Sequence, residues 1–386
     1  MQKILIVSSK NLLSQPFEGA QKRILDISKF LSKKNQIDLV CIGENILKKK
    51  NDLKHFNHFK TFRINFTSKI INMIFAFLKL EPVQNGYFFS KEMSNYIDEN
   101  KDNYDTIIFH LVRSAQYLPK EYRGKTILEM TDLMSANYDQ IIKNISVLNP
   151  IKYLYFFENI LVKNYEKKIS NFFDKVVFIS KKELKTSKTL IDKNKIAVVG
   201  NQFKIQSKTF KYKKNNYKIL FVGNVNYFPN KLACYNFAKK IMPKLNEKYE
   251  NIEFNIVGKI NFIDKFILSR LKNVKVHGPV QKIHKLVKKS ICGICNLEVA
   301  TGLQMKIFTY ISYGLPSIVH KNSFPKNIFK KNKQVLVYTK DVELISLISK
   351  LLENKRIANK ISNNSFHLLK NKFNSSKIYN DYLKIF

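Results

Sequence analysis

The sequence predicts an α/β protein built from two Rossmann-like domains that face each other across a cleft. Short β-branched runs alternate with longer amphipathic segments in the first half, and the same alternation restarts in the second half after a polar, basic stretch. The length of 386 residues agrees with two domains, because one domain typically holds roughly 150 residues. Parallel sheets bind ligands at the carboxyl ends of their strands, so two facing sheets predict one shared cleft.

The first half opens with a strand at 3–7, whose apolar run is shorter than the core of a signal peptide, about 7–15 residues. Segment 21–34 then places Ile24, Ile27 and Leu31 at helical spacing, and a strand at 37–43 completes a βαβ unit. The remaining strands of this half are expected at 105–109, 126–130, 175–180 and 195–200.

The second half follows a segment, 207–217, that has no apolar periodicity and is interpreted as a linker. Its helices are expected at 231–249 and 303–313, and its strands at 218–223, 252–258, 274–278, 292–297, 317–320 and 335–338. The expected domains are 1–206, 207–370 and a C-terminal helix, 371–386, that packs back on the first domain.

The charge is strongly positive, with 68 Lys and Arg against 29 Asp and Glu, a formal net charge of +39. Such a surface attracts polyanions. Because Lys, Asn and Ile are abundant throughout, as an AT-rich genome produces, composition explains part of this excess. The sequence holds no recognisable nucleic-acid-binding module, so no nucleic-acid partner is expected. A peripheral contact with anionic membrane is favoured, since each basic side chain contributes about 1 kcal/mol there.

The four cysteines are Cys41, Cys234, Cys292 and Cys295. They are too few and scattered for a disulfide framework, which predicts a reducing, cytoplasmic compartment. Cys292 and Cys295 form a CxxC pair, but a zinc site needs two further ligands, so core packing is the preferred interpretation. The longest apolar stretch, 70–80, is shorter than the ~20 residues that cross a bilayer.

The stretch 301–319, TGLQMKIFTYISYGLPSIV, carries the clearest chemistry. A polar, glycine-containing loop opens a helix at about Leu303, so backbone N–H groups and the positive end of the helix dipole suit a diphosphate. Lys306 lies in the first turn, where its ammonium can neutralise charge on a leaving diphosphate. Gly314 and Pro316 end the helix.

This stretch is similar to the donor-site helix of GT-B glycosyltransferases of family 4, with the pattern G-x-Q-x-K-x-x-E-x-x-x-x-G-x-P-V-V. The matching residues are Gly302, Gln304, Lys306, Gly314 and Pro316. Segment 219–245 resembles the F-x-G-x-M-x-Y-x-P-N opening of the second domain in a bacterial branch that makes exopolysaccharide and cell-envelope glycans. The residues that carry this likeness are Gly223, Asn224, Tyr227, Pro229 and Asn230.

The first half resembles the same branch. PFEGAQKR is similar to the loop P-x-x-G-G-x-x-x-R through Gly19 and Arg23, with Ala20 in place of the second glycine. VRSAQYL (112–118), EMTDLMSANY (129–138), YEKKI and VVFIS also resemble that branch. The likeness extends over most of the chain in the right order, and it implies the GT-B fold.

The resemblance implies an EC 2.4 enzyme, a hexosyl- or related glycosyltransferase of cell-envelope polysaccharide synthesis. It would move a sugar, with retention, from a nucleoside diphosphate sugar to a glycan or lipid-linked acceptor, without a metal or a tightly bound cofactor. The first domain would take the acceptor and the second the nucleotide sugar. Asp132 and Lys306 are the expected catalytic residues, and His110 and Arg113 lie on the acceptor side. The expected donor-binding residues are Gly19, Ala20, Gly223, Asn224, Gly302, Leu303, Gln304, Lys306 and Thr309.

The sequence departs from the family pattern at two positions. Thr309 stands where most relatives have the carboxylate that grips the donor ribose, and a hydroxyl cannot accept two hydrogen bonds as a carboxylate does. Thr131 replaces the histidine that commonly precedes Asp132. Thr309 motivates an alternative function, a non-catalytic GT-B relative that acts as a scaffold or nucleotide-binding protein; a nucleic-acid-binding protein is the third alternative.

Three assignments keep a structural alternative. Asp132 faces the cleft in the functional interpretation and is a helix N-cap in the other. His110 is a ligand in one interpretation and a structural residue in the other. The aromatic and lysine-rich segment 150–168 either lies on an anionic membrane, on its cytoplasmic face, or packs beside the sheet with Tyr and Phe in the core, which is preferred.

Overall fold

The computed structural model describes residues 1–12, 19–44, 54–179, 191–200, 205–206, 208–214, 217–280, 283–298, 303–373 and 375–386. The chain divides into two compact units. Unit 1 comprises Met1–Asn201 and Ser376–Phe386, and unit 2 comprises Gln202–Ser375. The sequence had placed the corresponding divisions at 206/207 and 370/371. The two units each contain a parallel sheet, which confirms the predicted α/β class.

In the described part of unit 1, seven parallel strands form a sheet in the order β3-β2-β1-β4-β5-β6-β7. The strands are β1 (Lys3–Ser8), β2 (Gln36–Ile42), β3 (Phe59–Phe62), β4 (Thr106–His110), β5 (Lys125–Thr131), β6 (Lys175–Phe178) and β7 (Ile196–Val198). The sequence analysis missed β3, because this edge strand is short and only Phe62 in it is buried. The order reverses between β1 and β4, where Val7 pairs with Phe109.

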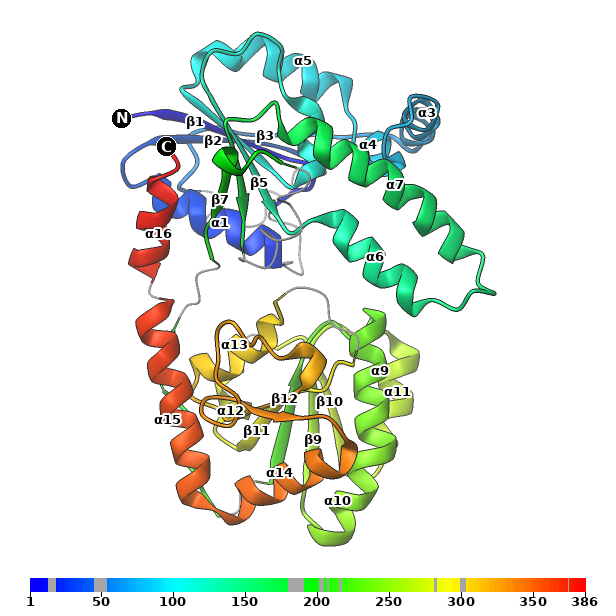
Figure 1. Cartoon of the computed structure of the whole chain (residues 1–386), viewed down its shortest axis with the longest axis vertical. Coiled ribbons are helices and arrows are strands. Elements are labelled where there is room, and N and C mark those ends of the chain that lie inside the picture. The colour runs from blue at the N-terminus through cyan, green and yellow to red at the C-terminus, as the bar shows by residue number, and fades with distance from the viewer. Residues whose placement is uncertain are drawn as a thin grey trace. The chain divides into compact units, whose positions relative to one another are not determined.

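The helices of unit 1 cover both faces of this sheet (Figure 1). They are α1 (Gly19–Leu31), α3 (Phe66–Leu78), α4 (Val83–Tyr87), α5 (Lys91–Asn100), α6 (Met134–Asn144), α7 (Ile151–Ser170) and α16 (Ser375–Leu383), with short 3₁₀ turns at Lys101–Asn103, Val112–Tyr117 and Lys193–Lys195. Helix α1 buries Ile24, Ile27 and Leu31, as the helical spacing predicts.

The C-terminal helix α16 packs on α1. The rings of Phe30 and Tyr379 stack with centroids 4.0 Å apart, and the Tyr379 hydroxyl donates to the Asp26 carbonyl at 3.3 Å. Tyr382 is fully buried. The last residues of the chain therefore form part of the core of unit 1.

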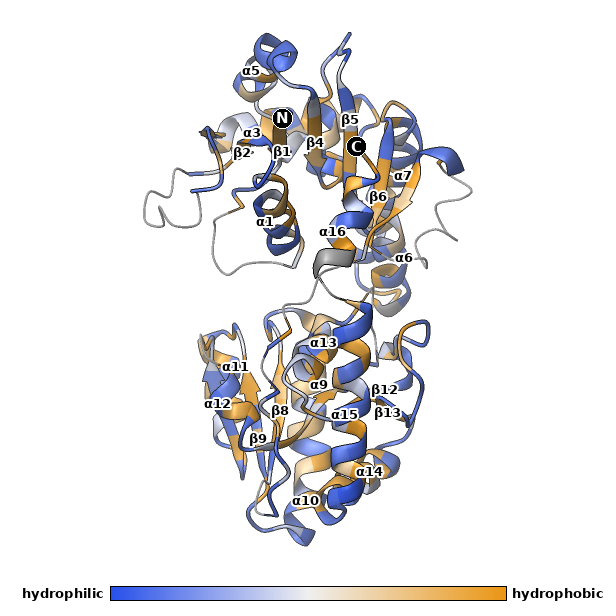
Figure 2. Ribbon diagram, turned by 90° about the vertical axis from the view of Figure 1, so that its left-hand side faces the viewer, coloured by the Kyte–Doolittle hydropathy of each residue, from blue (hydrophilic) through white to orange (hydrophobic). Residues whose placement is uncertain are grey.

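In the described part of unit 2, six parallel strands are ordered β10-β9-β8-β11-β12-β13. They are β8 (Lys218–Val222), β9 (Glu253–Val257), β10 (Val274–Gly278), β11 (Ser290–Cys295), β12 (Ser317–His320) and β13 (Leu336–Tyr338). The central strands β8 and β11 are almost continuously buried, as parallel strands covered by helices require, and β8 is largely orange in Figure 2. The order reverses between β8 and β11.

The helices of unit 2 are α9 (Phe228–Asn236), α10 (Met242–Lys248), α11 (Phe262–Ser269), α12 (His284–Val287), α13 (Met305–Ser312), α14 (Asp341–Glu353) and α15 (Lys355–Lys372), with a 3₁₀ turn at Lys321–Ser323. The single helix expected at 231–249 is interrupted by a π-helical turn, Phe237–Ile241. Pro243 lies at the start of α10, where its missing N–H and its ring disfavour continuous α-helical hydrogen bonding, which explains the interruption.

Candidate functional site

Helix α13 is fixed at the point where the strand order of unit 2 reverses. The Tyr310 hydroxyl accepts a hydrogen bond from the Val222 N–H of β8 at 2.8 Å and donates to the Ile294 carbonyl of β11 at 3.0 Å. A Cβ on Gly293 would lie 2.3 Å from the Tyr310 ring, so only glycine fits there. Ligands of open parallel sheets bind at this kind of position.

Lys306 lies on α13 with its side chain turned into unit 2. It is 8% exposed, and its Nζ donates to Asn230 Oδ1 at 2.6 Å and lies 4.0 Å from the centroid of the Phe221 ring. Burial lowers the pKa of this ammonium from its usual value. An ammonium has three N–H donors, and the bond to Asn230 uses one.

Asn230 connects Lys306 to the loop after β8. Its Nδ2 donates to the Asn224 carbonyl at 2.8 Å, and a Cβ on Gly223 would lie 3.1 Å from this nitrogen. The structure therefore brings together Gly223, Asn224 and Lys306 of the predicted site. Asn230 was not among the predicted site residues, although the motif NYFPN in the sequence contained it.

Gly258 allows the backbone at the end of β9 to lie close to the backbone at the end of β8. Its φ is +140°, and a Cβ there would lie 1.9 Å from the Gly223 carbonyl oxygen. The close approach that this glycine permits is therefore to the backbone of Gly223.

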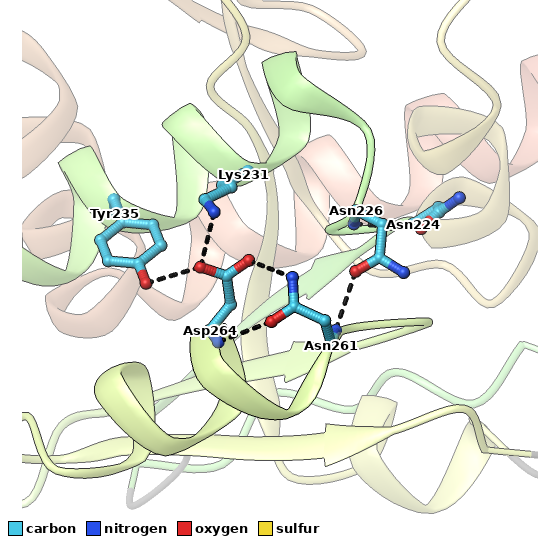
Figure 3. Close-up of polar contacts among 6 residues, drawn as sticks. All are labelled: Asn224, Asn226, Lys231, Tyr235, Asn261 and Asp264. Carbon is cyan, nitrogen blue, oxygen red and sulfur yellow. Dashed lines mark hydrogen bonds and ion pairs between the residues drawn. The ribbon is translucent and has the colours of Figure 1, made fainter.

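The loop after β8 is also tied to α11, as Figure 3 shows. The Asn226 N–H donates to Asn224 Oδ1 at 3.1 Å, and the Asn261 N–H donates to Asn226 Oδ1 at 2.8 Å. The loop that carries Asn224 is thus held by hydrogen bonds at both ends.

Asp264 anchors this arrangement from the first turn of α11. Its carboxylate accepts from Lys231 Nζ at 2.7 Å, from the Tyr235 hydroxyl at 2.8 Å and from Asn261 Nδ2 at 2.6 Å (Figure 3). Burial favours the protonated carboxyl, but the hydrogen bonds from Lys231, Tyr235 and Asn261 outweigh it and lower the pKa of Asp264.

Helix α13 begins at Met305, and Leu303 and Gln304 separate it from a stretch that the structure does not describe, 299–302. The predicted site residue Gly302 lies in that stretch and so outside the described residues. Leu303 and Gln304 are partly buried, and Gln304 occupies the N-cap position without capping the helix through its side chain. Thr309 is one turn further on, and its hydroxyl donates to the Met305 carbonyl at 3.1 Å. The Thr309 side chain thus presents a hydroxyl bonded within its own helix, at the position where the pattern that the sequence resembles has a carboxylate.

His110 ends β4, beside the reversal in the sheet of unit 1. It is 1% exposed, and neither ring nitrogen has a hydrogen-bond partner among the described residues. Burial, together with the positive charges of Arg23, Arg113 and Lys10, lowers the pKa of His110 to about 3. The imidazole is therefore neutral at physiological pH.

Arg23 of α1 forms a buried ion pair with Glu129 of β5, with Nε and Oε1 2.7 Å apart. Its Nη1 donates to the Gly200 carbonyl at 2.8 Å. The pair fixes the amino end of α1, where Gly19 is exposed and Ala20 is partly buried, relative to the sheet. A Cβ on Gly19 would meet open space.

The backbone is strained where β4 and β5 end. Leu111 and Thr131 have φ values of 68° and 65°, which are rare for residues with a Cβ and rarer still for β-branched Thr. Such strain concentrates at functional sites. Asp132 follows Thr131 directly and is partly buried. In the turn after β4, the Arg113 guanidinium lies 4.9 Å from the centroid of the Phe88 ring.

The helix after Asp132 is not capped by it. Leu133 occupies the N-cap position of α6, and the Glu166 carboxylate of α7 accepts from the N–H groups of Met134 at 2.7 Å and Ser135 at 3.3 Å. The alternative interpretation of Asp132 as an N-cap is therefore wrong. Glu166 supplies this function from a distant segment, which local sequence cannot indicate.

The four cysteines are free and buried. Cys292 and Cys295 both lie in β11, where every side chain is buried. Among the residues that the structure describes, no cluster of His, Cys, Asp and Glu is arranged to hold a metal ion.

Comparison with known proteins finds similarity in the second unit. Residues 216–354 match the family model described as Glycosyl transferases group 1. An uncharacterized 44.6 kDa protein in the cps region of Klebsiella pneumoniae is 28% identical over 159 residues. That alignment covers 39% of this chain and 39% of the relative's length.

Three solved structures share the fold of the whole chain. HepE from Anabaena, in complex with UDP-glucose, has a TM-score of 0.70 at 13% identity and covers 100% of this chain and 99% of its own. TarM has a TM-score of 0.68 at 11% identity, with 100% and 98% covered. Sucrose-phosphate synthase from Thermosynechococcus elongatus has a TM-score of 0.68 at 12% identity, with 100% and 98% covered. The chain therefore has the GT-B fold, as the sequence predicted, and residues 216–354 of its second unit are similar to glycosyl transferases group 1.

Proposed function

We propose that this GT-B protein is a glycosyltransferase that moves a sugar from a nucleoside diphosphate sugar to a glycan or lipid-linked acceptor, with retention. The observation that carries the proposal is the network of Lys306, Asn230 and Asn224, which lies at the strand-order reversal of the unit that matches glycosyl transferases group 1. The complex of HepE with UDP-glucose supports a nucleotide-sugar donor, and the cps-region relative supports a role in envelope polysaccharide synthesis.

In the proposed reaction, the bond between the anomeric carbon and the diphosphate breaks, and a bond to the acceptor hydroxyl oxygen forms on the same face of the sugar. The proton of that hydroxyl passes to the leaving diphosphate. Negative charge accumulates on the leaving diphosphate. We assign its stabilisation to Lys306, which Asn230 holds in place, and to the backbone N–H groups at the start of α13. Gly223, Asn224, Gly302, Leu303, Gln304 and Thr309 would line the donor site of unit 2.

In unit 1 we assign Gly19 and Ala20 to the donor and Asp132 to orienting the reacting groups. We assign neutral His110 to the acceptor side because its ring nitrogens lack partners in the described structure. Since the residue is 1% exposed, a sugar hydroxyl reaches it only after the residues that cover it move. Arg113 adds a positive charge on the acceptor side. We place the protein in the cytoplasm, where nucleotide sugars are its substrates, with no metal and no tightly bound cofactor in the reaction.

The assignment of Lys306 predicts a large loss of activity in Lys306→Gln. Removing a group that stabilises transition-state charge typically costs about 10²–10³ in kcat. The measurement is release of nucleoside diphosphate from a panel of nucleotide sugars. Lys265→Gln, at an exposed position on α11, is the matched control and should retain full activity. If Lys306→Gln folds normally and releases diphosphate as fast as the unchanged protein, Lys306 is not catalytic.

A non-catalytic, nucleotide-binding scaffold is the second candidate, and the hydroxyl of Thr309 favours it. Thr309→Glu would restore the carboxylate. Tighter nucleotide binding and faster donor turnover in Thr309→Glu would indicate a weakened enzyme. No turnover in either form, with unchanged nucleotide binding, would favour the scaffold.

A further inference from the structure

Helix α3 presents its large apolar side chains to solvent. Among the side chains of α3, Ala76 is the buried one, whereas Phe66 is 76% and Leu78 is 69% exposed. The other exposed apolar residues of this helix are Ile70, Ile71, Ile74, Phe75 and Phe77. A helix of a soluble domain normally shows the opposite arrangement, with its apolar stripe facing the core.

The inward side of α3 is made of small and polar groups. Asn72 Nδ2 donates to the Phe89 carbonyl at 3.0 Å. Gly86 of α4 lies so close to α3 that a Cβ there would be 2.3 Å from the Asn72 carbonyl oxygen. The hydrogen bond and the close backbone contact fix the orientation of α3, so the outward direction of its apolar side chains is built into the fold.

Helix α7 extends the same surface. Figure 1 shows α3 and α7 on one side of unit 1, and the rings of Phe77 and Phe157 meet with centroids 5.7 Å apart. The exposed apolar residues of α7 and of the turn before it are Val147, Leu148, Ile151, Tyr153, Leu154, Phe156, Phe157 and Ile160. We call these residues, together with those of α3 given above, the apolar face. The preferred expectation that Tyr and Phe of 150–168 lie in the core is wrong for Tyr153, Phe156 and Phe157.

The charged residues around the apolar face are predominantly basic. The lysines of the two helices and of the residue after α3 are Lys69, Lys79, Lys152, Lys163, Lys167 and Lys168. Helix α3 contains no Asp or Glu. The two carboxylates of α7 are engaged inside unit 1, since Glu158 accepts from the Val83 N–H at 3.0 Å and buried Glu166 caps α6. Glu81, at the edge beyond α3, remains exposed.

We propose that the apolar face docks unit 1 on the surface of an anionic phospholipid bilayer. Apolar side chains flanked by lysines match the acyl–headgroup boundary, where lysine stems lie along apolar surface and their ammonium groups reach lipid phosphates. Within the described residues no helix is long and apolar enough to cross a membrane, so the two helices lie on the bilayer. The 13 residues of α3 give it a length of about 20 Å for such a contact.

The charge argues against a second copy of this chain as the occupant. A two-fold dimer through this face would bring identical lysine-rich surfaces together, whereas a closed symmetric interface requires self-complementarity. An anionic bilayer supplies the opposite charge, and a neutral bilayer does not. Docking therefore depends on anionic lipid.

The test is co-sedimentation of the full chain with vesicles of phosphatidylcholine that contain phosphatidylglycerol, and with vesicles of phosphatidylcholine alone. We expect binding to the former and weak binding to the latter. The double variant Ile74→Ser/Leu78→Ser should lower binding by about tenfold or more, because burying one such side chain already contributes roughly a factor of ten. Lys167→Gln/Lys168→Gln should lower binding to phosphatidylglycerol vesicles and make the loss of binding with added salt less steep, because fewer charge pairs remain to be screened.

The control is Phe262→Ser/Ile263→Ser on α11 of unit 2, where the two side chains are 81% and 68% exposed. It removes a comparable exposed apolar surface and should retain vesicle binding. Equal loss in both double variants would mean unspecific adsorption and would overturn the proposal. So would a vesicle-independent dimer that Ile74→Ser/Leu78→Ser converts to monomer in light scattering. Release of nucleoside diphosphate in solution should be unchanged in Ile74→Ser/Leu78→Ser, so failure of docking and failure of the proposed activity are distinguishable.

Discussion

At the scale of single residues, buried polar groups hold the candidate site in place. Inside unit 2, the Lys306 ammonium donates a hydrogen bond to Asn230 Oδ1 and lies over the Phe221 ring, while burial lowers its pKa. Asp264 keeps its charge because three donors surround it. His110 is held neutral. The charge of Asp264 and the neutrality of His110 can each be tested by a substitution and by the pH dependence of stability.

Asp264→Asn should lower the free energy of unfolding at pH 7 by about 1.5–3 kcal/mol, the range for hydrogen bonds to charged groups. The pKa of Asp264 is depressed in the folded state, so its contribution is present above the ordinary value of about 3.9 and is lost as the pH falls through the folded pKa. The difference in the free energy of unfolding between Asp264→Asn and the unchanged protein should thus decrease below about pH 4. Urea denaturation across this range measures it, with Asp98→Asn at an exposed position as control.

His110→Gln should flatten the pH dependence of stability. In the unfolded chain a histidine binds a proton below about pH 6.5, whereas His110 in the folded protein does so only near 3. Stability should therefore be full above pH 6.5 and decrease as the pH falls toward 3. Urea denaturation at neutral and mildly acidic pH measures the slope. His367→Gln, at an exposed position, should leave this slope unchanged. If the slope in His110→Gln equals that of the unchanged protein, His110 is not held neutral.

At the scale of elements, the position of α13 depends on one side chain that joins two strands. The Tyr310 hydroxyl bonds both β8 and β11, and Gly293 leaves the space for its ring. This contact therefore sets the position of the amino end of α13, which carries Lys306. Sequence periodicity predicted the helix, but it gave no reason to connect Gly293 with Tyr310.

Gly293→Ala should therefore destabilise unit 2 and displace α13. An added Cβ would lie 2.3 Å from the Tyr310 ring, and forcing extra atoms into a packed core typically costs about 1–3 kcal/mol. The midpoint temperature of thermal unfolding and the affinity for nucleotide should both decrease. Gly200→Ala is the control, since a Cβ there meets open space. A Gly293→Ala protein with unchanged stability would show that the ring can move aside.

At the scale of the whole molecule, the two ends of the chain fold into the same unit. Residues after Ser375 belong to unit 1, and Tyr382 is fully buried in it. The apolar face on α3 and α7 belongs to the same unit. Unit 1 thus depends on both ends of the sequence, while unit 2 is a single continuous segment.

Tyr382→Ala should destabilise unit 1 selectively. Truncating a buried aromatic residue costs about 3–5 kcal/mol. Hydrogen exchange followed by mass spectrometry should show faster exchange in the strands of unit 1 and unchanged exchange in those of unit 2. Tyr153→Ala, on the exposed side of α7, is the control. Equal acceleration in both units would contradict the division of the chain.

The sequence by itself determined the α/β class, the order of most strands along the chain, the motif around Lys306 and the absence of a carboxylate at position 309. These depend on local spacing, which apolar periodicity and motif patterns record directly. Only the tertiary structure decided that Asn230 binds Lys306 and that Glu166 caps α6 in place of Asp132. It also decided that Tyr153, Phe156 and Phe157 of α7 face outward. These depend on which distant segments meet, because a side chain is buried by its neighbours in space, and its own pattern does not identify them.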